Sequence, residues 1–64
     1  MLVNGEQWDG PAGVTIAELV AGRGLPVRGV AVARNGEVVP RSRWEVVTLH
    51  PGDTVDIVTA VAGG

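Results

Sequence analysis

The chain has 64 residues, 45% of them hydrophobic, and a formal net charge of −2 at pH 7. This length leaves too little room for two cores or a deep catalytic cleft, and the hydrophobic content excludes a disordered chain. Five arginines against seven carboxylates do not form a nucleic-acid groove, so we expect no nucleic-acid partner. The apolar runs are too short to span a bilayer, so we expect no membrane contact either.

Cysteine and lysine are both absent from the sequence. Without cysteine there is no disulfide, no thiolate nucleophile and no thiolate metal site, and a reducing, cytoplasmic location is expected. Residues 1–5 lack the charged and apolar regions of a signal peptide, which favours the same location. We predict no metal site and no bound cofactor.

The first predicted element is a short hairpin. Leu2-Val3 and Gln7-Trp8 flank Asn4-Gly5-Glu6, and Asn-Gly is the pair that best tolerates the positive φ angles of a tight turn. Residues 9–13 contain two glycines and a proline and are therefore expected to form a loop.

A helix is predicted to begin after Thr15. Thr15 and Glu18 have the spacing of a capping box, in which each side chain bonds to the backbone of the other residue. Residues 22–24, Gly-Arg-Gly, provide an end to the helix, and Pro26 prevents its continuation. One apolar stripe suited to packing on a sheet is formed by Ile16, Leu19 and Val20.

Two further strands are predicted over residues 27–34 and 37–39. The first is rich in valine and alanine, and Asn35-Gly36 provides a second hairpin turn between the two. Residues 40–44, Pro-Arg-Ser-Arg-Trp, interrupt the strand pattern, because proline cannot donate to a ladder. We expect an irregular link that is packed by Trp44.

A short strand is expected over residues 45–49, followed by a turn at residues 50–53, His-Pro-Gly-Asp. The final strand begins after this turn and leads to Gly63-Gly64. Val55 and Ile57 share one face of this strand, and Val58 and Ala60 share the other, so both faces are apolar near its end. The second face is therefore either covered or kept for a partner.

The order of strand, strand, helix, strand, strand and final strand predicts an α+β fold. One helix must cover one face of a mixed sheet of about five strands, which is the layout of a β-grasp (ubiquitin-like) fold. In that fold the last strand lies centrally and parallel to the first. We expect a single domain over residues 1–64, with a flexible Gly-Gly tail at about residues 62–64.

Several sequence features together resemble one protein family. The run 35–41, Asn-Gly-Glu-Val-Val-Pro-Arg, is followed by Trp44, the last strand opens with Gly52-Asp53, and the chain closes with Ala62-Gly63-Gly64. This ordered combination resembles the ubiquitin-like ThiS/MoaD family, in particular its ThiS sulfur carriers of thiamine biosynthesis. The resemblance spans nearly the whole chain, and it implies a protein co-substrate that is not itself an enzyme.

The resemblance implies a chemistry at Gly64. A ThiF-like adenylyltransferase would use ATP to adenylate the Gly64 carboxylate, and sulfur from a donor protein or sulfide would then displace AMP. The resulting thiocarboxylate would give its sulfur to a ThiG-like thiazole synthase. ATP is thus used by the partner enzyme and is not bound by this chain.

Physical reasons support this hypothesis for the tail. A terminal carboxylate is ionised at neutral pH and resists nucleophiles, so it must first be activated. Glycine at Gly63 and Gly64 allows the backbone to enter a narrow channel in a partner, where side chains would clash. Val58 and Ala60 are the residues we expect to contact such a partner.

Other residues have simpler interpretations. His50 is explained by a position in a surface turn, and the two tryptophans by packing. Arg34, Arg41 and Arg43 form either a basic patch that meets a partner's carboxylates or the nucleotide, or a solvated face, the simpler account. We predict no catalytic residue, because no acidic side chain has the paired partner that acid and base chemistry requires.

Alternative functions remain open from the sequence. A carrier for another pathway, such as the small subunit of molybdopterin synthase, would use the same thiocarboxylate, and a ubiquitin-like modifier would form isopeptides after the same activation. A non-catalytic β-grasp binding module would use no tail chemistry. Deletion of Gly64 separates the classes, because only the binding module should keep its function.

Overall fold

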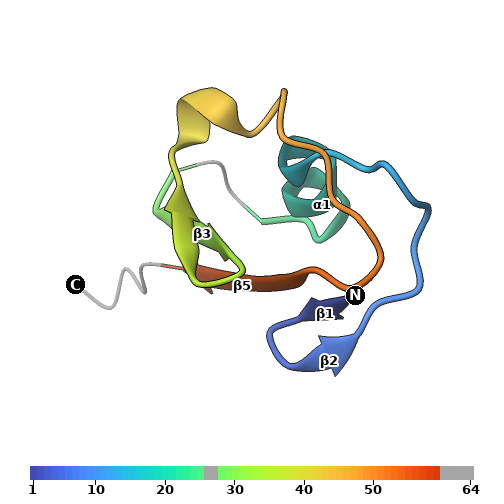
Figure 1. Cartoon of the computed structure of the whole chain (residues 1–64). Coiled ribbons are helices and arrows are strands. Elements are labelled where there is room, and N and C mark those ends of the chain that lie inside the picture. Colours follow the sequence, from blue (N-terminus) through green and yellow to red (C-terminus); the bar gives the residue numbers. More distant parts are fainter. Residues whose placement is uncertain (26–27, 60–64) are drawn as a thin grey trace.

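The computed structural model describes residues 1–25 and 28–59, which form a mixed five-stranded sheet with one α-helix packed on it (Figure 1). The strand order is β2-β1-β5-β3-β4, with β5 parallel to β1 and antiparallel to β3. The predicted β-grasp fold, with its last strand in the centre of the sheet, is therefore confirmed. The elements are β1 (Leu2–Val3), β2 (Glu6–Gln7), α1 (Ile16–Gly22), β3 (Val30–Arg34), β4 (Glu37–Val39), the 3-10 helix η1 (Arg41–Arg43) and β5 (Thr54–Thr59).

Both Asn-Gly turns form as predicted. Asn4 and Gly5 have φ angles of 53° and 81°, and Asn35 and Gly36 have φ angles of 52° and 83°. Two successive positive φ angles give a turn whose twist matches that of the flanking strands. These turns set the antiparallel pairs β1–β2 and β3–β4.

Helix α1 begins at the predicted cap. The Glu18 N–H donates to the Thr15 hydroxyl at 3.1 Å, and the Thr15 N–H donates to the Glu18 carboxylate at 2.9 Å. This reciprocal pair satisfies two N–H groups that the first helical turn leaves without partners. None of the helices in the described part of the chain has the length and apolar character needed to cross a membrane.

The core lies between α1 and one face of the sheet. It includes the predicted apolar stripe of the helix and Trp44, whose indole Nε1–H donates to the Val39 carbonyl at 2.9 Å. The indole is therefore buried with its polar group paired. The buried residues are Val3, Ile16, Leu19, Val20, Val32, Trp44, Leu49, Val55 and Ile57.

The link after β4 is more regular than predicted. Residues Arg41–Arg43 form η1, and the N–H groups of Val46 and Val47 both donate to the Arg43 carbonyl. The expectation of an irregular link was therefore wrong. Its packing by Trp44 is confirmed, since that side chain is only 4% exposed.

The short strand predicted over residues 45–49 was also wrong. In this part of the described chain only an isolated bridge forms, between Thr48 and Thr15. The turn after η1 uses the backbone of the first residues of the segment, and Leu49 donates its N–H to the Val14 carbonyl. The segment therefore crosses the start of α1 and does not extend the sheet.

Strand β3 begins at Val30, later than the predicted start at residue 27. Gly29 has a φ angle of 76° and belongs to a turn that precedes the strand. Val27 lies outside the described residues.

Candidate functional site

The first half of β5 is held on both sides. On one side the Leu2 N–H donates to the Asp53 carbonyl at 3.0 Å, and the Asn4 N–H donates to the Val55 carbonyl at 2.8 Å. On the other side β3 pairs with β5 along its length. Val55 and Ile57 point into the core and are 0% and 7% exposed. This half of the strand is therefore fixed by the sheet and by the core together.

Asn4 extends this support beyond the end of β1. The register of β1 reaches only Thr54 and Val55, so the N–H of Ile57 has no strand partner on that side. The Asn4 side-chain oxygen accepts this N–H at 2.7 Å. The sequence predicted only the turn conformation of Asn4, and this contact was missed because it joins residues 53 positions apart.

The far end of β5 is exposed on the face that points away from α1. Among the described strands only β3 pairs with it there, through Ala31 with Val58 and Val30 with Thr59. The Val58 side chain is 63% exposed. Figure 1 shows β5 starting near β1 and the N-terminus, at the right of the view, and running to the left below β3.

Val58 belongs to a largely apolar surface that we call the outer sheet face. Side chains alternate along each strand, so this face carries the residues whose neighbours in the chain are buried in the core. Val38 is 70% exposed and Leu2 40% exposed on it. By the strand register the outer sheet face contains Leu2, Gln7, Ala31, Ala33, Val38, Thr54, Asp56 and Val58.

The structure places one of the predicted site residues. Val58 is accessible on the outer sheet face, as a partner contact requires. Ala60, Gly63 and Gly64 lie outside the described residues, as does the predicted tail at residues 62–64. Their roles stay predictions.

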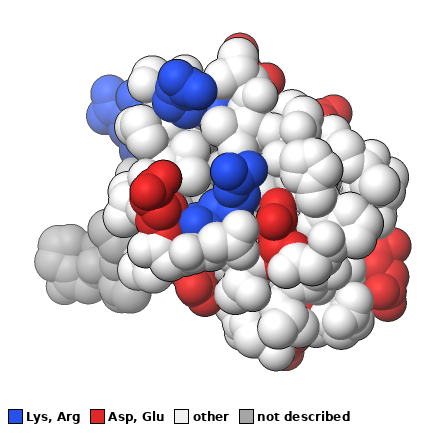
Figure 2. Space-filling model, viewed as in Figure 1, with Lys and Arg blue, Asp and Glu red and all other residues white. Residues whose placement is uncertain are grey.

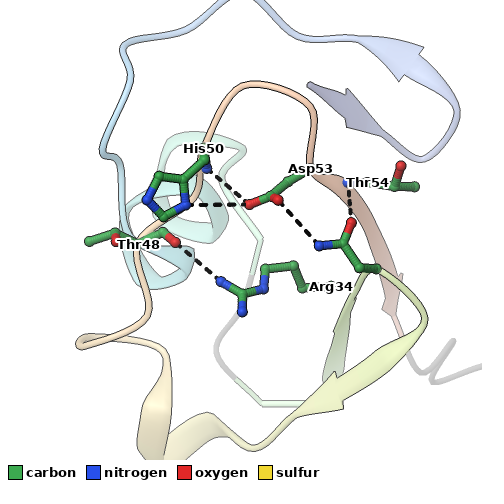
Figure 3. Close-up of polar contacts among 6 residues, drawn as sticks. Arg34, Thr48, His50, Asp53 and Thr54 are labelled. Atoms are coloured by element: carbon green, nitrogen blue, oxygen red, sulfur yellow. Dashed lines mark hydrogen bonds and ion pairs between the residues drawn. The ribbon is translucent and has the colours of Figure 1, made fainter.

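The start of β5 is tied to the β3–β4 turn by a polar network around Asp53 (Figure 3). Its carboxylate accepts the backbone N–H of His50 at 2.9 Å and the side-chain amide of Asn35 at 3.2 Å. The Asn35 side-chain oxygen in turn accepts the N–H of Thr54 at 2.9 Å. The network fixes the point where the central strand begins.

Hydrogen bonding lowers the pKa of Asp53 below its ordinary value. The largest contribution is the backbone N–H of His50, and the Asn35 amide and the positive charge of Arg34 act in the same direction, whereas burial opposes them. All three favourable groups stabilise the ionised carboxylate. The His50 side chain is 68% exposed, which confirms its predicted surface position.

The predicted basic patch is only partly assembled. Arg34 and Arg43 line one hollow of about 350 Å³ beside β4, and Arg41 is exposed outside its lining. The space-filling view shows positive side chains over η1 and near β3, with negative side chains close to the latter (Figure 2). Arg34 donates to the Thr48 carbonyl at 3.3 Å (Figure 3).

A second hollow of about 290 Å³ lies beside Trp8, Pro11 and His50. Trp8 is half-buried and packs against the core, as predicted for a packing residue. Within residues 1–25 and 28–59, no three His, Asp or Glu side chains come together in a way that would hold a metal ion.

In residues 1–25 and 28–59, the first and last strands are parallel neighbours, a single α-helix covers one face of the sheet, and the other face is open and largely apolar. These features define a ubiquitin-like β-grasp protein. The model of the ThiS family matches residues 1–64. The chain belongs to the ThiS family.

Individual relatives agree with this assignment. The sulfur carrier protein ThiS of Escherichia coli (strain K12) is 31% identical over 64 residues, a match that covers 100% of this chain and 97% of that protein. The crystal structure of the thiamine biosynthesis protein ThiS from Geobacter metallireducens superposes with a TM-score of 0.78 at 30% identity, covering 98% of this chain and 96% of that one.

A longer relative has a different name. A thiazole synthase of Paramagnetospirillum magneticum (strain ATCC 700264 / AMB-1) is 38% identical over 64 residues. The match covers 100% of this chain but only 20% of that protein, so the chain spans about a fifth of this relative's length.

Proposed function

We propose that this chain is a sulfur carrier of thiamine biosynthesis, in which the Gly64 carboxylate is converted to a thiocarboxylate that supplies the sulfur of the thiazole ring. The observation that carries the proposal is the match to the sulfur carrier protein ThiS of Escherichia coli, which includes 97% of that protein. The chain is then a co-substrate of its partner enzymes.

The chemistry needs two steps at one carbon. In the first, a carboxylate oxygen of Gly64 attacks the α-phosphorus of ATP on a ThiF-like adenylyltransferase, pyrophosphate leaves, and an acyl adenylate forms. In the second, sulfide attacks the acyl carbon and AMP leaves, so a C–S bond replaces the C–O bond to AMP. Activation is required because an ionised carboxylate is a poor acceptor for nucleophiles. Where the persulfide of a sulfur-donor protein attacks in place of sulfide, an acyl disulfide forms and AMP leaves, and a thiolate must then attack the donor's sulfur, which releases the thiocarboxylate and leaves a disulfide.

The described part of the chain supports this role through β5. The first half of the strand is fixed in the core, and its far end carries Val58 on the outer sheet face. We assign Val58 and Ala60 to the contact with the adenylyltransferase, and Gly63 to the passage of the backbone into its active site. An exposed apolar surface of this kind marks interaction sites in small proteins.

A ThiG-like thiazole synthase is the proposed acceptor of the sulfur. Support comes from the relatives named thiazole synthase, about a fifth of whose length matches this chain. A carrier joined covalently to its acceptor would act at an effective concentration on the order of millimolar. A separate carrier must instead bind the synthase through its own surface.

Growth of a bacterium that lacks its own thiamine sulfur carrier tests the pathway. We expect the chain to restore growth without thiamine, and the same chain without Gly64 to fail although it folds. If the chain restored molybdopterin synthesis in a strain that lacks the small subunit of molybdopterin synthase, but did not restore growth without thiamine, it would belong to that pathway instead. Isopeptide-linked products on other proteins would indicate a ubiquitin-like modifier, and equal function without Gly64 would indicate a binding module.

We include a cytoplasmic location in this proposal, because the chemistry at Gly64 needs ATP and the partner enzymes in the same compartment as the chain. Fractionation of cells that produce the chain, with a cytoplasmic marker enzyme as reference, checks it. Recovery of the chain in another fraction would contradict the location.

A further inference from the structure

A hollow of about 350 Å³ beside β4 combines two kinds of lining. Its aliphatic part comes from β4, from the residue that follows it and from the turn after η1. Its positive charge comes from the end of β3 and from η1. The residues concerned are Val38, Val39, Pro40, Val47, Arg34 and Arg43.

The charge of this hollow is not consumed by ion pairs within the described residues, where the single pair within 4.0 Å joins His50 and Asp53. Arg34 uses one guanidinium nitrogen to donate to the Thr48 carbonyl, which holds the side chain in place. A guanidinium group has five N–H donors, so further donors remain for a ligand. Glu37 lines the same hollow and Arg34 also acts on Asp53, so Arg43 is the less compensated of the two arginines.

The shape of the site favours an extended ligand. β4 is an edge strand of the sheet, and a segment that runs along a sheet edge is extended, with alternate side chains towards the surface. By the strand register Arg34 and Val39 lie on the side of the sheet that faces α1, whereas Val38 lies on the outer sheet face, so the hollow meets the outer sheet face at Val38 on the β4 edge. A partner seated on the outer sheet face can therefore reach the hollow without a gap.

We propose that this hollow binds an extended acidic segment of the enzyme that activates Gly64, with carboxylates on Arg43 and Arg34 and aliphatic side chains on Val38 and Val47. The proposal rests on the proposed function. Bidentate pairing of carboxylates by guanidinium groups gives such a contact both charge and geometric selectivity.

The nucleotide is a less suitable ligand for these arginines than an acidic segment. Arg34 pairs with Val55 at the start of β5, whereas the residues that lead to Gly64 follow Thr59 at the other end. The four-residue separation along the strand amounts to about 13 Å. Arg34 therefore lies at the opposite end of β5 from the last described residue, while a protein segment can extend from the hollow along the outer sheet face.

The test is the KM of the carrier in adenylation by the ThiF-like enzyme, measured for the unchanged chain and for two charge reversals. Arg43→Glu alters the hollow, and Arg23→Glu makes the same change of net charge at the exposed end of α1, outside the hollow lining. Both side chains are exposed, so neither change should unfold the chain. We expect Arg43→Glu to raise KM roughly five- to tenfold at low salt, with a smaller effect in high salt, and Arg23→Glu to change KM less than about twofold.

Equal KM values for the two variants would overturn the proposal, because they would show only a long-range effect of net charge or no effect. If the unchanged chain is adenylated normally and the two variants have equal KM values, the binding role of the hollow is excluded and the proposed function is not affected. Failure of the unchanged chain to be adenylated at all would count against the proposed function and, with it, against this contact.

Discussion

The two halves of β5 differ in what surrounds them. On one side Thr54 is bonded to Asn35 and residues 55–57 pair with β3. On the other side the first half of β5 is bonded to β1 and Asn4, and its inward side chains are buried. At Val58 and Thr59, β3 is the only described strand that continues the pairing, and the Val58 side chain is 63% exposed. One strand therefore provides stability at its start and an accessible surface at its end.

This division suits the carrier role that we propose. The sheet and core fix the position of β5 up to Thr59, and the exposed surface beside that end of the strand is available to a partner. The short β1 is what creates the difference, because its register stops at Val55. Substitutions in the two halves should therefore separate stability from partner recognition.

The largest effect on stability is expected in the first half. Ile57→Ala removes a side chain that is 7% exposed, and such core truncations cost about 2–5 kcal/mol in the free energy of unfolding. A chain of this length is stabilised by only roughly 3–10 kcal/mol, so the variant should be close to unfolded. Val58→Ala, the matched control, should cost less than about 0.5 kcal/mol. Urea unfolding of both variants checks this, and similar costs would remove the distinction between the halves.

The next effect is expected in recognition. Val58→Asp should raise the KM for adenylation roughly tenfold, because it places a charge in a contact that excludes water. Ala12→Asp is the control, since Ala12 is exposed in the loop before α1 and lies outside both the sheet and the hollow beside β4. Unchanged kinetics for Val58→Asp, with a native unfolding midpoint, would exclude the outer sheet face as the adenylyltransferase contact.

The role of Asn4 can be isolated by two substitutions. Asn4→Gly tolerates the positive φ angle but loses the oxygen that accepts the Ile57 N–H, so we expect a loss of about 1 kcal/mol in the free energy of unfolding. Asn4→Asp keeps an acceptor oxygen and should be closer to the unchanged chain. The opposite order in denaturant unfolding would show that turn conformation alone explains the residue.

The smallest effect is expected with pH. The pKa of Asp53 is lower in the folded chain than its ordinary value, mainly because of the His50 N–H, so folding stability gains from ionisation. This contribution is complete above the unfolded pKa and is lost as pH falls through about 4 and below. Asp53→Asn should flatten that part of the stability curve in thermal unfolding between pH 3 and pH 6. An equally steep curve for the variant would assign the dependence to other carboxylates.

The features that the sequence predicted correctly are those with local chemical causes. The two Asn-Gly turns, the Thr15–Glu18 capping box and the apolar stripe of α1 each depend on residues only a few positions apart. The strand predicted over residues 45–49 does not form, because the N–H groups of Val46 and Val47 are used by the turn after η1. This turn accompanies the burial of Trp44, which depends on tertiary contacts. The Asn4–Ile57 hydrogen bond was missed because it too depends on tertiary structure, which brings together two residues 53 positions apart.

For the candidate site, the alternation of side chains predicted that Val58 lies on the opposite face of the strand from Val55 and Ile57, and it left open whether that face is covered. The 63% exposure of Val58 shows that the face is open at this residue within the described structure. The sequence did not separate Arg41 from Arg34 and Arg43, because the three-residue turn of η1 sets which side chains line the hollow. The chemistry at Gly64 was inferred from a family resemblance, and membership of that family is shown by the match over residues 1–64.

The most direct test of the carrier hypothesis is the intact mass of the 64-residue chain after incubation with ATP, a ThiF-like enzyme and sulfide. We predict a product heavier by the difference between one sulfur and one oxygen atom, formed only with ATP and absent when Gly64 is deleted. An unchanged mass, with an enzyme that is active on its own carrier and a native Gly64 carboxylate, would contradict the account.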